Sequence, residues 1–411
     1  MVLNYIWIGF FLIAFVIALV KLILFNDLEI FSQLVTSTFD TAKVGFELSI
    51  GLTGVMAMWL GIMKIGEKAG IVNILTVLLG PFFKRLFPEI PPNHPAIAPI
   101  FMKLSANLLG LDNAGTPLGI KAMKEMQTLN PTPDTASNAQ IMFAVLNTTG
   151  LTFIPIQVLL YRTQLNSANP ADVFIPIILS TSITALSAII LVALYQKIKL
   201  LDWVLLSYFG GIAFILSLII YYFLSLSQEE ISIVSSIVSN LLLFGIIIIF
   251  IILGLIQKVR IYETFIEGAK EGFEVATQLI PYLVSILVAV GVFRVSGALD
   301  LIVNSFQWTF EYLGMNAEFT KALPVAFMKP LSGSGATSLV IETMKEKGAD
   351  SFAGRLASVF QGTTDTTLYI LAVYFGAVNI KKTRYATTCA LLASLIGLTS
   401  AIFISYIFFE V

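Results

Sequence analysis

The sequence predicts an all-α polytopic membrane protein. Of its 411 residues, 57% are hydrophobic and only 12% are charged, and the mean hydropathy is +0.91. Soluble domains of this length are not so apolar. Two further stretches, residues 96–126 and 323–346, are apolar but interrupted by glycine and polar residues. Paired interrupted segments of this kind indicate the binding site of a transporter.

Nine apolar runs are long enough to cross a bilayer, which takes about 20 residues in a helix. We expect these crossings at about residues 5–25, 44–65, 138–161, 173–196, 202–224, 236–257, 275–293, 352–378 and 385–409. The mixed segments 26–43 and 261–270 suit helices lying at the membrane interface. The marginal runs 71–86 and 298–313 are expected to be interfacial or re-entrant.

Each interrupted stretch is predicted to form a re-entrant hairpin of two short helices. The first hairpin breaks at residues 110–117, Gly-Leu-Asp-Asn-Ala-Gly-Thr-Pro, and the second at residues 332–338, Ser-Gly-Ser-Gly-Ala-Thr-Ser. Non-helical backbone at membrane depth must be buried in protein or line a wet cavity, so the breaks predict a polar centre. The helix N-terminus after each break suits an anionic or hydrogen-bond-accepting ligand. Tight helix contacts through small residues are the structural alternative.

The two halves of the chain contain an internal repeat. The matches are Lys43-Val-Gly-Phe-Glu47 with Lys270-Glu-Gly-Phe-Glu274, Gly70 with Gly297, Met102-Lys103 with Met328-Lys329, Met123-Lys-Glu125 with Met344-Lys-Glu346, and Asn147-Thr-Thr149 with Gly362-Thr-Thr364. The offset drifts from 227 residues (43 to 270) to 215 (147 to 362). We expect domains at 1–200 and 263–411, with repeat cores at 37–162 and 263–378, joined by linking helices at 201–262.

Basic residues predict that the two copies have inverted topology. Lysine and arginine cluster at residues 64–85, 197–199, 258–260 and 381–384. These clusters fall on one side of the membrane if both hairpins re-enter, and the positive-inside rule makes that side cytoplasmic. The lysine-free loop 225–235 is then outside. Inverted repeats of this kind occur in many alternating-access transporters.

The candidate solute-binding residues are polar side chains of the two hairpins and of the crossings that follow them. They are Ser105, Asn107, Asn113, Thr116, Asn147, Thr148, Ser332, Ser334, Thr337, Ser338, Gln361 and Thr364. Asp112 and Asp365 are carboxylates at predicted membrane depth, where an ionised group facing lipid costs about 3 kcal/mol. With Thr363 and Thr366 they are candidates for coupling Na⁺ or a proton. Hydroxyls at 363, 366 and 367 are expected to share one helical face.

Structural roles remain open for both carboxylates, a helix cap for Asp112 and an interhelical hydrogen bond for Asp365. No cofactor or metal is expected, since the chain has one histidine and one cysteine. The net charge of −1 gives no support for a nucleic-acid partner. No nucleophile elbow or His-Glu-x-x-His sequence is present, which disfavours an enzyme. The expected partners are a small-molecule solute and the bilayer, and a homo-oligomer is left open.

Two segments carry a resemblance to known families. Residues 110–119 followed by Lys121-Ala-Met123 resemble the signature of spore maturation protein A, and Lys329-Pro-Leu-Ser-Gly-Ser-Gly-Ala336 that of spore maturation protein B. The chain is therefore similar to a fusion of the two, both of which belong to the nucleoside recognition, or gate-domain, group. The resemblance implies two gate domains, hairpin-centred binding and an elevator motion. The cysteine-rich gate and the GTPase domain of the related iron permeases are not found.

We interpret the chain as a secondary transporter in a bacterial inner membrane, with alternating access around the two hairpins. Its solute would be nucleoside-like or a small organic anion, coupled to an ion. The first alternative is a non-transporting scaffold or assembly factor, which would have an occluded centre. The second is an intramembrane enzyme, which would need a nucleophile and a base within about 3 Å of each other.

Overall fold

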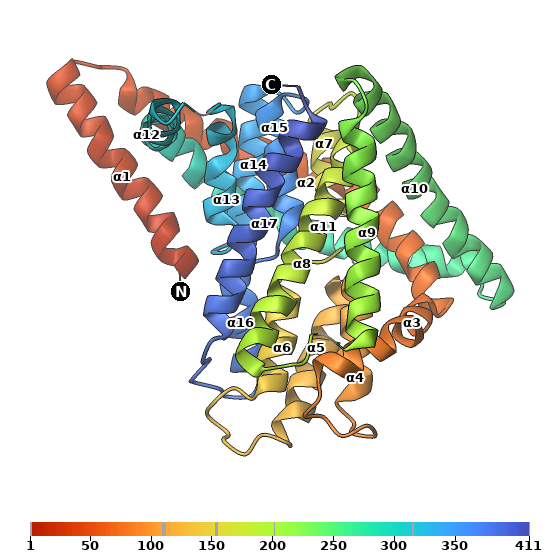
Figure 1. Ribbon diagram of the computed structural model, residues 1–411. Helices are drawn as coiled ribbons and strands as arrows, with labels where there is room; N and C mark the ends of the chain where they lie inside the picture. The colour runs from red at the N-terminus through yellow and green to blue at the C-terminus, as the bar shows by residue number, and fades with distance from the viewer. Residues whose placement is uncertain (1, 109–111, 153–154, 201, 315, 411) are drawn as a thin grey trace.

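The computed structural model describes residues 2–410 except 109–111, 153–154, 201 and 315 (Figure 1). Within these residues the structure is helical throughout, apart from loops and one isolated bridge between Thr135 and Lys382. The helices are α1 (Val2–Phe25), α2 (Ile30–Lys68), α3 (Ile71–Leu86), α4 (Ile97–Leu108), α5 (Asp112–Gln127), α6 (Asn138–Thr148), α7 (Ile156–Gln164), η1 (Pro170–Val173), α8 (Phe174–Gln196), α9 (Trp203–Leu224), α10 (Gln228–Ile256), α11 (Ile261–Val295), α12 (Ala298–Tyr312), η2 (Glu318–Ala322), α13 (Leu323–Met328), α14 (Gly333–Lys347), α15 (Phe352–Thr363), α16 (Thr367–Gly376) and α17 (Ala386–Phe408).

Six of the described helices, in α1, α2, η1–α8, α9, α10 and α17, are long and apolar enough to cross a membrane. A seventh span is added if α11 and α12, bent by 66° at their junction, are taken together. The protein is therefore a multi-pass membrane protein, as the composition predicts. The expected total of nine crossings is not reproduced, because two of the predicted spans are broken into short helices.

Two predicted spans are interrupted near their middles, and the first interruption coincides with a glycine and a proline. In the first, α6 ends at Thr148 and Gly150 adopts a left-handed φ of 60°, which glycine tolerates. Pro155 then precedes α7. In the second, residues 364–366 are not helical and separate α15 from α16. The hydroxyls at 363, 366 and 367 consequently do not share a helical face, which corrects that expectation.

The long helices α2 and α11 pack against each other in antiparallel directions. A β-carbon on Gly45 would lie 3.0 Å from the Cα atom of Val284, and one on Gly272 would lie 2.7 Å from that of Ala57. Lys64 pairs with Glu271 at 2.9 Å. The segments expected as separate interfacial helices, 26–43 and 261–270, mostly belong to these continuous helices. Packing between α2 and α11 therefore overrides the amphipathic pattern of these segments.

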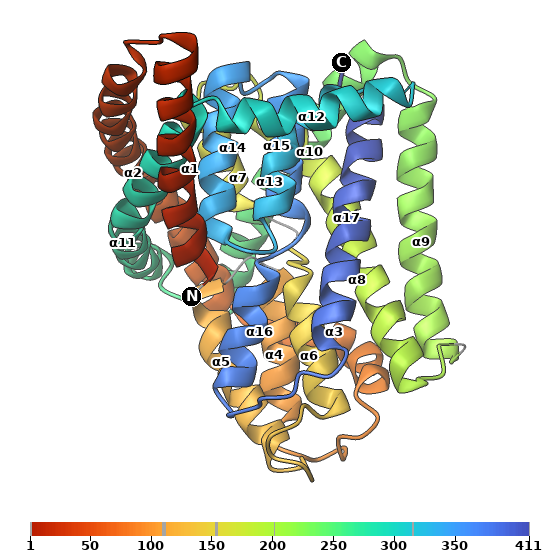
Figure 2. The ribbon, with the colours of Figure 1, turned by 90° about the vertical axis from the view of Figure 1, so that its left-hand side faces the viewer.

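The short helices α3 and α12 begin in the same way, after glycines in the left-handed conformation. Gly70 has a φ of 83° and Gly297 a φ of 88°, and the two are matched in the repeat. Each glycine turns the chain away from the long helix before it. The marginal runs are thus separate short helices, and α12 lies across one end of the molecule (Figure 2).

The two hairpins lie at opposite ends of the molecule (Figure 2). Helices α4 and α5 occupy one half together with α6 and α16, whereas α13 and α14 occupy the other half with α7 and α15. Buried apolar side chains follow the same division: Met126 and Phe143 belong to one cluster, and Val340 and Phe360 to the other. Helices α8 and α17 pack along each other and pass through both halves (Figure 1).

Basic residues from distant parts of the chain gather at the end that holds α4 and α5. Arg85 pairs with Asp202 at 3.2 Å, directly after the cluster at 197–199. Tyr195 stacks on Tyr385 with ring centroids 4.7 Å apart, which joins the same end to the cluster at 381–384. These contacts bring Arg85 and the clusters at 197–199 and 381–384 to one end of the molecule.

Candidate central site

The two broken spans meet at their breaks. The backbone amide of Asp365 donates to the carbonyl oxygen of Thr148 at 3.0 Å, and the Thr364 hydroxyl donates to the same oxygen at 3.0 Å. A β-carbon on Gly150 would lie 2.9 Å from the Asp365 nitrogen. An unpaired amide at membrane depth costs several kcal/mol. The second break therefore supplies the donors and the first break the acceptor of hydrogen bonds that stabilise both.

The tip of the second hairpin rests on the break between α15 and α16. The amide of Leu368 donates to the carbonyl of Pro330 at 3.0 Å. A β-carbon on Gly333 would lie 2.6 Å from the Thr366 hydroxyl oxygen. Ser332 caps α14, because its hydroxyl accepts from the Gly335 amide at 3.0 Å. The N-terminal end of α14 is therefore positioned beside the break.

A first polar cluster joins the first hairpin to both broken spans. The Asn107 side-chain amide donates to Asn147 Oδ1 at 2.9 Å, and Lys103 donates to Asn107 Oδ1. The Tyr374 hydroxyl donates to the same Asn147 oxygen at 3.5 Å. Gly119 is needed beside Tyr374, because a β-carbon on Gly119 would lie 2.4 Å from the Tyr374 hydroxyl oxygen. The tyrosine comes from α16, in the other repeat copy.

A second polar cluster has the same construction in the other half. Gln361 Nε2 donates to Thr337 Oγ1 at 2.9 Å, and Tyr161 makes a further side-chain hydrogen bond with Thr337. Tyr161 lies in α7, so again the tyrosine comes from the opposite copy. Gln361 is only 6% exposed, yet its Oε1 has no hydrogen-bond partner among the described residues. A buried acceptor without a donor costs about 1–3 kcal/mol, which a solute donor would recover.

Comparison with known proteins assigns the family. The family model Gate, described as nucleoside recognition, matches residues 49–163 and 276–381, one stretch in each half and together more than half of the chain. The chain belongs to the Gate family. It is 51% identical over 156 residues to spore maturation protein B of Bacillus subtilis, covering 38% of this chain and 86% of that protein. It is 40% identical over 188 residues to spore maturation protein A of the same organism, covering 46% of this chain and 92% of that protein.

The chain thus matches most of both relatives, which confirms the resemblance to a fused A and B protein. No solved structure is significantly similar to the chain. The Gate family is transporter-like, in line with the predicted class, and the names of the two relatives refer to spore maturation.

Most predicted site residues of this Gate protein lie at the centre. Those brought together at the breaks, the tip of the second hairpin and the two polar clusters are Asn107, Asn147, Thr148, Ser332, Ser334, Thr337, Gln361, Thr364, Asp365 and Thr366. Asp112, Asn113 and Thr116 have side chains outside the described part of the structure. Asp365 is half-buried, and its Oδ1 accepts from the Thr366 amide at 2.6 Å.

Three predicted site residues use their hydroxyls in hydrogen bonds outside the two polar clusters. Ser105 lies 3.2 Å from the Thr76 hydroxyl of α3. The hydroxyls of Ser338 and Thr363 donate to carbonyls of their own helices, at 3.1 and 2.7 Å. These short-range hydrogen bonds satisfy the hydroxyls without a ligand.

Sequence reasoning missed three residues of the centre, Lys103, Tyr161 and Tyr374. Lys103 is only 5% exposed, and its match with Lys329 in the repeat was a signal that could have found it. Tyr161 and Tyr374 gave no such signal, because their contacts join opposite copies of the repeat. Pairing across copies is not visible in sequence spacing.

A buried ion network fastens α7 to α15 at the end opposite the first hairpin. Arg162, fully buried, contacts Asp172 and Asp350 at 2.8 Å each, and Arg355 contacts Asp172 at 2.7 Å. Burial acts to raise the pKa of Asp350, but hydrogen bonds from Ser167 and from a backbone amide, with the Arg162 charge, outweigh it and lower that pKa. Two cations and two anions balance, so the network is structural.

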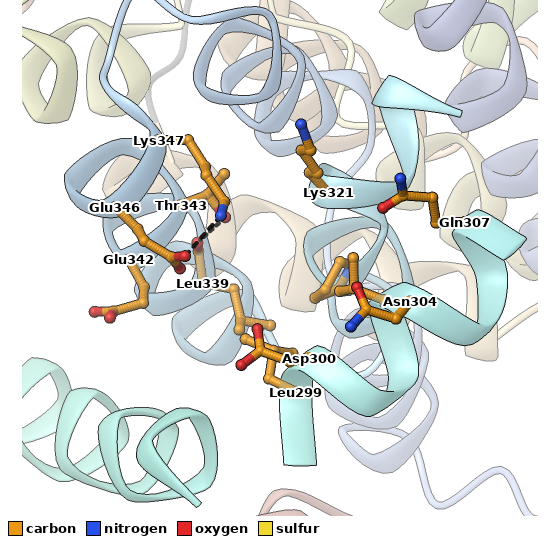
Figure 3. A pocket seen from close by; sticks show the side chains of 12 residues that line it. Leu299, Asp300, Asn304, Gln307, Lys321, Leu339, Glu342, Thr343, Glu346 and Lys347 are labelled. Atoms are coloured by element: carbon orange, nitrogen blue, oxygen red, sulfur yellow. Dashed lines mark hydrogen bonds and ion pairs between the residues drawn. The ribbon is translucent and has the colours of Figure 1, made fainter. Parts of the chain in front are cut away.

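A cavity of about 90 Å³ lies between α12 and the second hairpin (Figure 3). Asp300, Asn304 and Gln307 of α12 face Thr343 and Glu346 of α14 across it. Its volume corresponds to about three water molecules. None of the predicted site residues lines it, and the described residues contain no cluster of histidine, cysteine or carboxylate side chains that suits a metal ion.

Proposed function

We propose that this protein is a secondary transporter of a small polar solute, and that the crossing of the two broken spans is its binding site. The contact of Asp365 with Thr148 carries the proposal, because it places two non-helical segments side by side in a membrane protein. Broken helices in transporters expose helix ends and carbonyls to solutes and ions. The buried Oε1 atom of Gln361 accepts no hydrogen bond from the described residues, which supports a solute that carries a hydrogen-bond donor.

We infer that the two copies are inverted repeats with re-entrant hairpins. Gly45 and Val284 are in contact, and so are their repeat equivalents at the offset of 227, Gly272 and Ala57. Two equivalent helices that contact each other in antiparallel directions are related by a twofold axis in the membrane plane. Gly150 and Asp365 are equivalents at the offset of 215 and also touch, as residues on such an axis do.

Alternating access would move one part of the protein against another. The moving body in this proposal contains both hairpins, both broken spans, α8 and α17, which are joined by the central hydrogen bonds. The frame contains the long pair α2 and α11. Substrate would be exposed first toward one hairpin opening and then toward the other.

Asp365 is proposed to bind the coupling cation, Na⁺ or a proton. Hard cations prefer oxygen ligands, and the carboxylate of Asp365, half-buried at the break, is such a ligand, with its Oδ1 held by the Thr366 amide. A cation bound there would help to hold the two breaks together. The membrane is proposed to be the bacterial inner membrane, with the basic end cytoplasmic.

Uptake into proteoliposomes tests the proposal. The full chain is reconstituted, and uptake of labelled uridine, succinate and benzoate is measured under an inward Na⁺ gradient, an inward proton gradient or neither. The proposal expects uptake of at least one solute to depend on one of the gradients. Uptake no greater than in empty liposomes under all conditions would contradict it and favour the scaffold.

A further inference from the structure

An ion pair joins the second hairpin to the long helix α11. Arg294 Nε, in the last turn of α11, lies 2.6 Å from Glu342 Oε1 of α14. The Glu342 side chain is only 8% exposed, and α14 packs against α11 around the pair. Lys345, on the same face of the hairpin, interacts electrostatically with Glu342 and with Glu47 of α2. In the proposed transport cycle α11 belongs to the frame and α14 to the moving body, so this ion pair crosses the interface between them.

The repeat relates this ion pair to two residues of the first copy. The offset of 227 residues makes Arg294 equivalent to Glu67. The offset of 221, set by the repeated Met-Lys-Glu sequence (123 to 344), makes Glu342 equivalent to Lys121. Both charges are reversed between the copies. Opposite charges are therefore kept at both pairs of positions, although the helix that carries the cation is exchanged.

Contacts between α2 and α11 support the offset of 227 at this end of the helices. A β-carbon on Gly291 would lie 2.6 Å from the Thr41 side chain, and one on Gly268 would lie 2.6 Å from that of Lys64. These contacts are equivalent, because Lys64 matches Gly291 and Thr41 matches Gly268 at this offset. The same offset relates the glycines that follow the two helices, so the alignment holds at the charged positions between them.

The two copies differ in whether the ion pair is formed. Lys121 is exposed and has no ion-pair partner among the described residues. Glu67 pairs instead with Lys64 of its own helix, at 3.4 Å. In the described part of the chain, α5 does not pack on α2 to the extent that α14 packs on α11. The pair is therefore closed in copy two and open in copy one.

We propose that the two pairs are alternative latches, one for each access state of the transporter. Arg294 and Glu342 hold the moving body against the frame in the state seen here, and Glu67 and Lys121 hold it in the opposite state. The proposal rests on the transport function above, in which inverted copies exchange their roles between the two states. The N–H at Arg294 Nε makes no hydrogen bond among the described residues. The closed pair thus lacks the added strength of a charge-assisted hydrogen bond at that atom, which favours reversible opening.

Cross-linking of the open pair tests the proposal. Glu67→Cys and Lys121→Cys are combined in the full chain with Cys389→Ala, and a flexible bifunctional maleimide is added to the protein in liposomes. The yield is measured with and without Na⁺, at low and neutral pH, and with uridine, succinate or benzoate. We expect a cross-link whose yield changes among these conditions. Adding Arg294→Gln or Glu342→Gln opens the other latch and should raise the yield about twofold or more.

Matched controls separate the latch from a general loosening of the protein. Arg260→Gln changes an exposed arginine before α11 and should leave the yield unchanged. Lys64→Cys with Glu271→Cys places both cysteines in the frame, at the 2.9 Å ion pair between α2 and α11, and should cross-link equally under all conditions. If the glutamine variants do not fold, the dependence of the 67–121 yield on the conditions still decides the matter.

Two results would overturn the inference. One is the absence of a 67–121 cross-link under every condition, and the other is a yield that neither the conditions nor the glutamine variants change. Both results would leave gradient-driven uptake by wild type untouched, so the transporter proposal would survive them. The uptake assay decides that proposal independently.

Discussion

Gly150 and Asp365 touch across the point where the two broken spans cross. Gly150 has a φ of 60°, and a β-carbon on it would lie 2.9 Å from the Asp365 nitrogen and 3.0 Å from the Thr364 carbonyl carbon. Both features require glycine, one because of the backbone conformation and the other because of space. The contact holds Asp365 in place without using its side chain.

Gly150→Ala should therefore separate the breaks. A left-handed non-glycine residue costs about 1–3 kcal/mol, and the clash adds to this cost. We expect a lower melting temperature and loss of uptake, measured by differential scanning fluorimetry and in proteoliposomes. The matched control is Gly210→Ala in α9, where a β-carbon would meet nothing within 4 Å. Equal melting temperatures for the two variants would contradict the close contact.

Gln361→Met should weaken solute binding with little loss of stability. The substitution removes the unpaired buried acceptor and one hydrogen bond to Thr337 while roughly keeping the side-chain volume. A solute donor that uses Oε1 would lose a hydrogen bond of about 0.5–1.5 kcal/mol. The KM for uptake should rise several-fold. Gln307→Met, at the cavity between α12 and α14 and outside the central clusters, is the control. An unchanged KM for Gln361→Met would remove Gln361 from the site.

Arg162→Met should be strongly destabilising. It leaves Asp172, 5% exposed, with Arg355 as its one ion-pair partner among the described residues. Breaking a buried ion pair in this way costs about 3–5 kcal/mol. The melting temperature should fall by far more than that of Arg260→Met, which changes an exposed arginine. Similar melting temperatures would show that the network contributes little.

Asp350 should make stability depend on acid pH. Its pKa is lowered from 3.8 in the folded protein, so the folded state favours the ionised form. That contribution is fully present above the unfolded-state pKa and is lost as the pH falls through the lower folded-state value. Between neutral pH and about pH 3, the melting temperature of wild type should therefore fall more steeply than that of Asp350→Asn. Parallel curves for the two proteins would be evidence against this role.

The membrane class, the two related halves of the chain and the short helix pairs α4–α5 and α13–α14 could be predicted from composition and spacing. The predicted breaks in these pairs, 110–117 and 332–338, were too long, because α5 already begins at Asp112 and α14 at Gly333. The breaks at Thr148 and Asp365 could not be predicted, because an apolar run of suitable length with scattered threonines is also what an unbroken span looks like. The two breaks are stabilised where they meet, because the Asp365 amide and the Thr364 hydroxyl both donate to the Thr148 carbonyl. That pairing joins residues more than 200 positions apart.

The tyrosines illustrate the same limit. Tyr374 lies in copy two but hydrogen-bonds to Asn147 of copy one. Tyr161 lies in copy one but hydrogen-bonds to Thr337 of copy two. The hydrogen-bond partner of each depends on how the copies cross, which no local pattern records. Similarly, α2 and α11 run on as continuous helices that pack on each other at Gly45 and Gly272, although the mixed segments 26–43 and 261–270 are typical of interfacial helices.

The most direct test of coupling at the crossing is cation-driven uptake by Asp365→Asn. Asparagine keeps the shape and can still accept the Thr366 amide at the position where Asp365 does so at 2.6 Å, but it removes the negative charge. An interhelical hydrogen bond alone is worth about 0.6 kcal/mol, so a purely structural role predicts nearly normal uptake. We predict that the variant folds with a melting temperature close to that of wild type and loses the gradient-dependent uptake in proteoliposomes. Uptake equal to wild type with Na⁺, without Na⁺ and across pH would contradict the account.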